Sequence, residues 1–225
     1  MLAAGNTTSA ESSEALEKLC QTYWYPLYVY IRRKGYNVDD AKDLTQEFFA
    51  QLLARNYLSV ADRNKGKFRS FLLASLEHFL AREWTKAHAQ KRGGGRPSFS
   101  LDELDAENRY LLEPPHDLTP KKMFDQRWAM TVLDQAMARL RDECMSNHKA
   151  DLLSKLEGLL SGEKGEASYA QVAAYLNMSE GAIKMAVLRL RRRYGELIRA
   201  EIAQTVTSPK DAEEELQFLF SALRD

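Results

Sequence analysis

The sequence has few cysteines, no long apolar run and no net charge, and each shortage excludes a class of protein. Cys20 and Cys144 are its only cysteines in 225 residues and lie far apart, so neither a disulfide framework nor a CxxC metal site is expected. No apolar run approaches the roughly 18 residues of a membrane span, and the first ten residues lack the basic and apolar regions of a signal peptide. We therefore expect a cytoplasmic protein that contacts no membrane.

The net charge of zero conceals a segregated distribution, because 32 basic residues balance 32 acidic ones only over the whole chain. Five Lys and Arg lie between Arg82 and Arg96, and six lie between Lys184 and Arg199, with one acid in each stretch. Residues 101–117 hold six acids and one arginine, and the tail from Asp211 onward holds five acids. Segregated charge of this kind indicates surfaces for charged partners, including nucleic acid.

The apolar residues recur at helical spacing, with little alternation, which predicts an all-α fold. Helices are expected from near Ser13, from Asp39 or Asp40, and from about Lys67 to Gln90. Further helices are expected from Thr119-Pro120 to about Cys144, over 149–160, over 168–204 in two parts, and over 209–223. The expected organisation is a disordered N-terminus (1–12), a first helical domain (13–92), a flexible Gly/Pro-rich and acidic linker (93–119), a second helical domain (120–204) and an acidic amphipathic helix (205–225).

The clearest local signal is the segment 168–194, SYAQVAAYLNMSEGAIKMAVLRLRRRY. Ser168 and Gln171 form a capping-box pattern for a short helix, and Ser179 can cap a longer one. Between them the turn is only a few residues long, which predicts a helix-turn-helix. The residues expected to face the core are Val172, Ala173, Leu176, Ile183, Val187 and Leu190. The alternative is a solvated basic helix that packs only on its own domain.

With this motif in the second half, the chain resembles bacterial sigma factors of the small, two-domain, extracytoplasmic-function type. A second, independent part of the resemblance is DLTQEFF at Asp43 to Phe49, followed by GKFRSFLL at Gly66 to Leu73 and a basic stretch ending at Arg92. The resemblance covers about residues 13–92 and 120–204. It implies a sigma factor that binds core RNA polymerase at the β′ clamp, reads two elements of double-stranded promoter DNA and stabilises the opened strands.

The resemblance also assigns roles to individual residues. The clamp-binding positions are Asp43, Gln46 and Glu47. At the −10 region it implies Phe71 and His78, and the neighbouring basic residues suited to phosphates are Arg82, Lys86, Lys91 and Arg92. The residues expected at the −35 element are Ser179, Ala182, Lys184, Met185, Leu188, Arg189, Arg191 and Arg192, with Arg193 as a further basic side chain.

The chain departs from the family pattern at a few of these positions. Ala74 stands where an arginine is usual, and His78 stands where an asparagine near the flipped promoter base is usual. Met185, Ala186 and Leu188 replace polar or basic residues. The base preference of the family therefore does not transfer to this chain.

The expected function needs no catalysis and no cofactor. The Gly93 triplet and Gly162-x-x-Gly165 lack the Gly-Lys-Ser/Thr ending of a phosphate-binding loop, and Cys144 with His148, expected to be an ordinary surface pair, cannot close a metal site. The alternative function is a stand-alone helix-turn-helix regulator that binds DNA without recruiting polymerase. An anti-sigma or other regulatory protein is a further partner that the family implies. The acidic C-terminal helix is expected either to bind such a partner or to pack back on its own domain.

Overall fold

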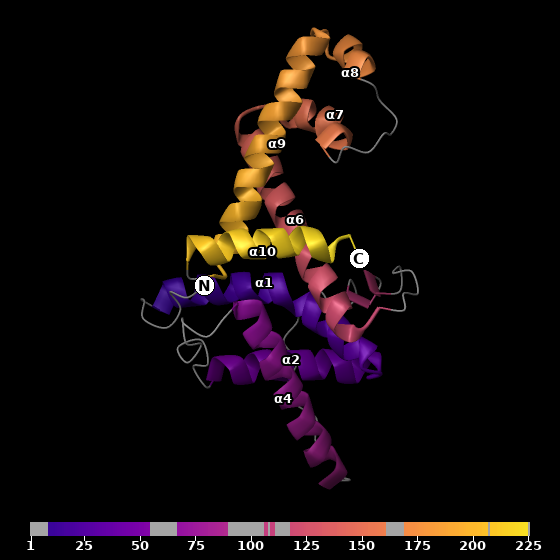
Figure 1. Ribbon diagram of the computed structural model, residues 1–225, viewed down its shortest axis with the longest axis vertical. Coiled ribbons are helices and arrows are strands. Elements are labelled where there is room, and N and C mark those ends of the chain that lie inside the picture. The colour runs from indigo at the N-terminus through magenta and orange to yellow at the C-terminus, as the bar shows by residue number, and fades with distance from the viewer. Residues whose placement is uncertain are drawn as a thin grey trace. The chain divides into compact units, whose positions relative to one another are not determined.

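Every regular element that the computed structural model describes is an α-helix, which confirms the all-α prediction (Figure 1). The described residues are 9–54, 67–89, 106–107, 109–110, 118–160, 169–206 and 208–224. The helices are α1 (Ser9–Arg33), α2 (Val38–Ala54), α4 (Phe68–Ala89), α6 (Pro120–Ser146), α7 (Ala150–Leu160), α8 (Tyr169–Tyr175), α9 (Glu180–Ala203) and α10 (Pro209–Ala222). Among these described helices, none combines the length and apolar character that crossing a membrane requires.

The chain divides into two compact units. The first comprises Met1–Thr131 and Ala203–Asp225, and the second comprises Val132–Ile202. This division differs from the expected segments, because the start of α6 and the whole of α10 belong with α1, α2 and α4. Helix α1 begins at Ser9 rather than near Ser13, so residues 9–12 are helical and are not part of a disordered N-terminus.

Helix α1 is the central helix of the first unit. Every residue from Thr22 to Ile31 is buried, so the helix is covered on all sides. The sequence explains this, since a helix that is apolar all round is stable only inside a protein. The ring of Tyr23 meets Phe68 of α4 edge to face, with 5.6 Å between the ring centroids.

Helix α2 begins one residue earlier than expected, because Asn37 caps it. The Asn37 side-chain oxygen accepts a hydrogen bond from the Asp40 amide at 2.8 Å. Four apolar residues recur at helical spacing in this sequence; Ala41, Phe48 and Leu52 are buried and Leu44 is only half-buried. In Figure 1, α4 crosses α2, and the contact between them includes Phe48 and Phe79, whose ring centroids are 5.6 Å apart.

Residues of the expected linker also pack on α1. The carboxylate of Glu107 accepts hydrogen bonds from the Tyr28 hydroxyl and from the Arg32 guanidinium, the latter at 3.0 Å from Nη2. Arg32 also lies over the Tyr110 ring, 4.8 Å from its centroid. Ala106 is buried. This part of the acidic stretch is therefore attached to the first unit.

Helix α10 starts where the sequence predicts, after Ser208, whose hydroxyl accepts from the Asp211 amide at 3.1 Å. The helical spacing of Leu216, Leu219, Phe220 and Leu223 predicts that they share one buried face; Leu216 and Leu219 are buried, but Phe220 is 46% exposed, so this prediction is wrong for Phe220. Its place is taken by Glu215, only 1% exposed, and by the half-buried Phe218. The helix packs back on the chain, but on the first unit rather than on the second.

A buried ionic cluster around Arg69 explains why a carboxylate lies on the inner face of α10. The Arg69 guanidinium donates to Asp125 of α6 and to Glu215, at 3.2 Å from Nε to Oε2. It also lies 3.9 Å from the Phe218 ring centroid and 5.0 Å from that of Trp128. Burial raises the pKa of Asp125, although Arg69 acts in the opposite direction. One cation therefore joins α4, α6 and α10.

Candidate nucleic-acid interface

The second unit contains a short helix and a long helix joined by a tight turn. Helix α8 ends with the Met178 amide donating to the Ala173 carbonyl at 2.9 Å, and Asn177 takes a left-handed conformation with φ of 51°. Asparagine tolerates this conformation better than most residues. The Ser179 hydroxyl then accepts from the Ala182 amide at 3.1 Å, which confirms that Ser179 caps α9. Ser168, the other predicted cap, lies outside the described residues.

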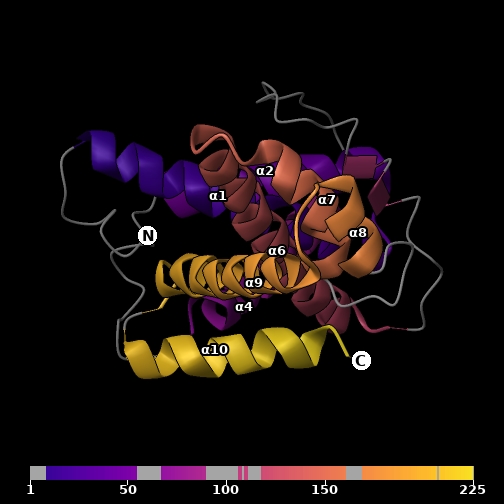
Figure 2. The same cartoon turned by 90° about the horizontal axis from the view of Figure 1, so that it is seen from above.

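A compact core holds the two helices in place. It consists of Leu156 from α7, Val172 and Ala173 from α8, and Ile183 and Val187 from α9, all buried. The half-buried Leu176 and Leu190 pack against it, so all six side chains expected to face inward do so. Figures 1 and 2 both show α7 and α8 beside the N-terminal half of α9. The opposite face of α9 is thereby left at the surface.

The residues predicted for the −35 element lie mainly on this exposed face of α9. Lys184, Met185 and Leu188 are exposed, with Met185 at 49% and Leu188 at 58%. Ala182 is half-buried, and Ser179 is exposed but its hydroxyl is used by the cap. The structure therefore brings most of the predicted set onto one surface.

The basic side chains of α9 differ in how they are held. Among the described residues Arg189 makes no hydrogen bond or ion pair. Lys184 lies 2.6 Å from Glu180, which raises the pKa of the Lys184 ammonium. Arg191 donates to the Leu159 carbonyl at 2.7 Å, and Arg192 donates to Glu196 at 3.3 Å. All four side chains are exposed, so the two ion pairs, Lys184–Glu180 and Arg192–Glu196, can be exchanged for another anion at little cost.

Arg193 has a structural role instead. It donates two hydrogen bonds to Glu143 of α6, at 2.8 Å and 2.7 Å, and a third to Glu196 at 3.0 Å. The hydrogen bonds from Arg193 lower the pKa of both carboxyl groups. The Arg193 guanidinium is therefore paired with two carboxylates at once, unlike the other basic side chains of α9.

In the first unit, the predicted clamp-binding residues lie on α2. Asp43 is exposed, whereas Gln46 and Glu47 are half-buried. The Glu47 carboxylate accepts a hydrogen bond from the Gln51 amide at 3.2 Å. The three positions follow the i, i+3, i+4 spacing that places side chains on adjoining parts of one helix face. This face is acidic and polar, as the sequence predicts.

The residues predicted for the −10 region are more dispersed along α4. His78, Arg82 and Lys86 are exposed, and Lys86 lies 2.6 Å from Glu83. Phe71 is half-buried, with its ring centroid 6.2 Å from that of Phe68. Lys91 and Arg92 lie outside the described residues.

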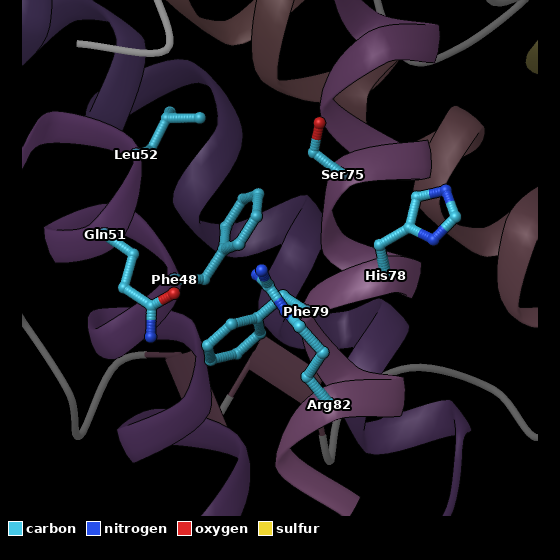
Figure 3. A pocket seen from close by; sticks show the side chains of 7 residues that line it. All are labelled: Phe48, Gln51, Leu52, Ser75, His78, Phe79 and Arg82. Atoms are coloured by element: carbon cyan, nitrogen blue, oxygen red, sulfur yellow. The ribbon is translucent and has the colours of Figure 1, made fainter. Parts of the chain in front are cut away.

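A pocket of about 260 Å³ lies between α2 and α4 (Figure 3). Its apolar lining is Phe48, Leu52 and Phe79, and its polar lining is Gln51, Ser75, His78 and Arg82. Figure 3 shows the Phe48 and Phe79 rings close together and the Arg82 side chain near them. The pocket therefore combines an aromatic floor with a polar rim.

Among these lining residues the sequence predicts DNA-binding roles for His78 and Arg82 and none for Gln51 and Ser75, although a signal exists. Ser75, His78 and Arg82 follow each other at intervals of three and four residues, and Gln51 stands three residues after Phe48. Polar residues at helical spacing beside buried phenylalanines indicate the edge of a helix–helix contact, where a pocket can remain open to solvent.

No group of three or more metal-ligating side chains lies close together within the described ranges. Cys144 is buried at 7% exposure, so the expectation that Cys144 and His148 form a surface pair is wrong for Cys144. Burial raises the pKa of the Cys144 thiol. His148 is exposed and takes a left-handed conformation, with a φ of 54°, in the turn that follows α6.

Comparisons with known proteins do not add to this geometry. No match to the chain was found among protein-family models, curated proteins or solved structures. The sigma-factor resemblance of the sequence therefore stays a prediction.

Proposed function

We propose that this chain is a bacterial sigma factor of the extracytoplasmic-function type, which directs core RNA polymerase to specific promoters. In this proposal α2 binds the β′ clamp of the polymerase, α4 contacts the opened −10 region, and α9 enters the major groove of the −35 element. The chain itself catalyses no reaction. It supplies sequence specificity and stabilises separated strands.

The observation that carries the proposal is the outer face of α9. A capped helix start, a buried core on one side and exposed Lys184, Arg189, Arg191 and Arg192 on the other are what a groove-reading helix requires. Phosphate contacts by such side chains supply affinity and fix the register of the helix on DNA. A helix that only packed on its own unit would not need this concentration of exposed charge.

The pocket between α2 and α4 supports the assignment of the first unit. An unstacked base is held by apolar or aromatic groups below it and by polar groups at its edge. Phe48 and Phe79 supply the first kind of group, and Ser75, His78 and Arg82 supply the second. Gln51, which lines the pocket, donates to Glu47 of the proposed clamp-binding residues, so one small unit can engage both polymerase and DNA.

The test is in vitro transcription from a genomic fragment library with bacterial core polymerase, with and without the full-length chain. We expect new transcripts that share an upstream motif of two elements. Asp43→Lys should abolish co-elution with core and transcription together. Arg189→Ala should leave co-elution intact and weaken transcription. Asp142→Lys, the same charge change at an exposed site on α6, is the matched control and should alter neither.

Two outcomes would overturn the proposal. If the chain does not bind core and yields no transcripts, it is not a sigma factor. If the free chain alone protects a specific DNA sequence from nuclease and core adds nothing, the stand-alone regulator is the correct reading.

A further inference from the structure

The centre of the exposed face of α9 carries no hydrogen-bonding side chain. Gly181, Met185 and Leu188 follow one another at intervals of four and three residues, so they form one stripe along the first turns of the helix. A Cβ built on Gly181 would meet nothing within 4 Å, so the stripe begins on open surface. Met185 is 49% and Leu188 is 58% exposed. A helix that reads bases by hydrogen bonds would carry polar side chains here.

We propose that Met185 and Leu188 read the 5-methyl groups of thymines in the major groove of the −35 element. This inference rests on the proposed function and specifies its recognition chemistry. Each base pair shows a different pattern in the major groove, and the thymine methyl is the apolar group in that pattern. Apolar side chains placed at base edges can distinguish thymine from cytosine by contact with this methyl group.

The residues around the stripe favour DNA as its occupant. Lys184 on one side and Arg189 on the other are exposed cations, and Arg192 continues the outer line of the helix. Two apolar side chains bordered by cations suit a polyanion that presents methyl groups between its phosphates. An apolar protein partner would offer these cations no anion, whereas DNA phosphates would. Gly181 contributes by allowing a close approach of the helix backbone to the duplex.

The experiment uses the complex of the full-length chain with bacterial core polymerase. A duplex library with random positions is first selected with this complex, and the more upstream of the two enriched blocks is taken as the −35 element. Each thymine of that block is then replaced singly by deoxyuridine, which keeps base pairing and removes only the methyl group. Dissociation constants are measured by competition.

We expect one or two positions at which deoxyuridine weakens binding about fourfold, the factor that corresponds to roughly 0.8 kcal/mol per buried methyl group. With Met185→Ala or Leu188→Ala, the thymine and deoxyuridine duplexes should bind equally at the position that the substituted side chain reads. With Met145→Ala, which changes a methionine 56% exposed near the end of α6, the fourfold difference should remain. Arg189→Ala should weaken both duplexes by the same factor.

The inference is overturned if binding is sequence-specific but no deoxyuridine in the upstream block weakens it, or if the block contains no thymine. It is also overturned if the two alanine variants keep the full sensitivity. These outcomes leave the proposed sigma function standing. If the complex selects no sequence at all, the proposed function itself fails, so the two failures can be told apart.

Discussion

At the level of single residues, the start of α9 depends on Ser179. Its hydroxyl satisfies the Ala182 amide, which has no partner within the helix. We expect Ser179→Ala to lower the free energy of unfolding by about 1 kcal/mol. Amide hydrogen exchange should accelerate at Ala182. Urea titration and exchange measured by NMR check both expectations.

Ser154→Ala is the control for this variant, because Ser154 is an exposed serine inside α7 whose hydroxyl donates to the Asp151 carbonyl. Removing that hydrogen bond leaves no helix-terminal amide without a partner, so the free energy of unfolding should change little. Equal effects of the two substitutions would contradict the capping role of Ser179.

Arg193 makes the second unit sensitive to acid. Its hydrogen bonds hold the pKa of Glu143 and Glu196 below the ordinary value of 4.5. Because both pKa values are lowered in the folded chain, the stabilisation by these bonds is complete above about pH 4.5. It is lost as the pH falls through the lower pKa values of the folded chain.

We therefore expect Arg193→Ala to move both carboxyl titrations back toward 4.5, as followed by carbon NMR of the side chains. The change in stability at neutral pH should be small, since exposed ion pairs contribute little. Arg189→Ala should leave both titrations where they are. A titration of Glu143 that did not respond to Arg193→Ala would contradict the assignment.

At the level of elements, α10 is attached to the first unit by Glu215. This carboxylate pairs with Arg69 and lies 3.1 Å from Lys67. Glu215→Ala would leave Arg69 buried with Asp125 as its remaining carboxylate. We expect a loss of about 3 kcal/mol in the free energy of unfolding, at the lower end for breaking a buried pair. Urea titration gives the loss, and hydrogen exchange shows whether α10 is released.

The neighbouring Glu214 provides the matched control. Its side chain is 48% exposed, and its carboxylate lies 3.7 Å from Lys67. Glu214→Ala should change the free energy of unfolding by no more than about 0.5 kcal/mol. Similar losses for the two variants would mean that the burial of Glu215 is unimportant for holding α10.

The bounds of the helices were easier to predict than the helices against which they pack. The helices α6 and α10 begin where the sequence predicts, after Thr119 and Ser208, because each start is set by a cap contact over three residues. The start of α2 was placed late because Asn37 was not recognised as a cap. The attachment of α10 to the first unit could not be predicted, since helical periodicity shows which face is apolar and not what covers it.

At the level of the whole molecule, the separation of charge should regulate DNA binding. Asp102, Glu103 and Asp105 belong to the acidic stretch of the linker and lie outside the described residues. The sequence predicts that these acids either repel DNA from the free protein or occupy a basic channel of the polymerase. On the first of these alternatives, neutralising all three to Asn, Gln and Asn should raise the affinity of the free chain for duplex DNA.

The expected increase should depend on salt. It should be large at about 0.01 M ionic strength, where the Debye length is roughly 30 Å, and much smaller at about 0.1 M, where it is roughly 10 Å. Neutralising the exposed Asp134, Asp142 and Glu213 is the control for net charge alone. Unchanged DNA affinity together with unchanged transcription would show that the acidic stretch has neither role.

The sequence by itself determined that the chain is all-helical, the caps Thr119 and Ser179 and the inward-facing residues of α8 and α9, because each depends on contacts within a few residues of the chain. It also indicated the exposed basic face of α9. Only the tertiary structure decided which charges are available there. Arg193 is taken up by Glu143, fifty residues away, whereas Arg189 is not held by any described residue. Arg69 became a buried cation for the same reason: its partners come from helices distant in sequence, and only their packing brings the carboxylates to it.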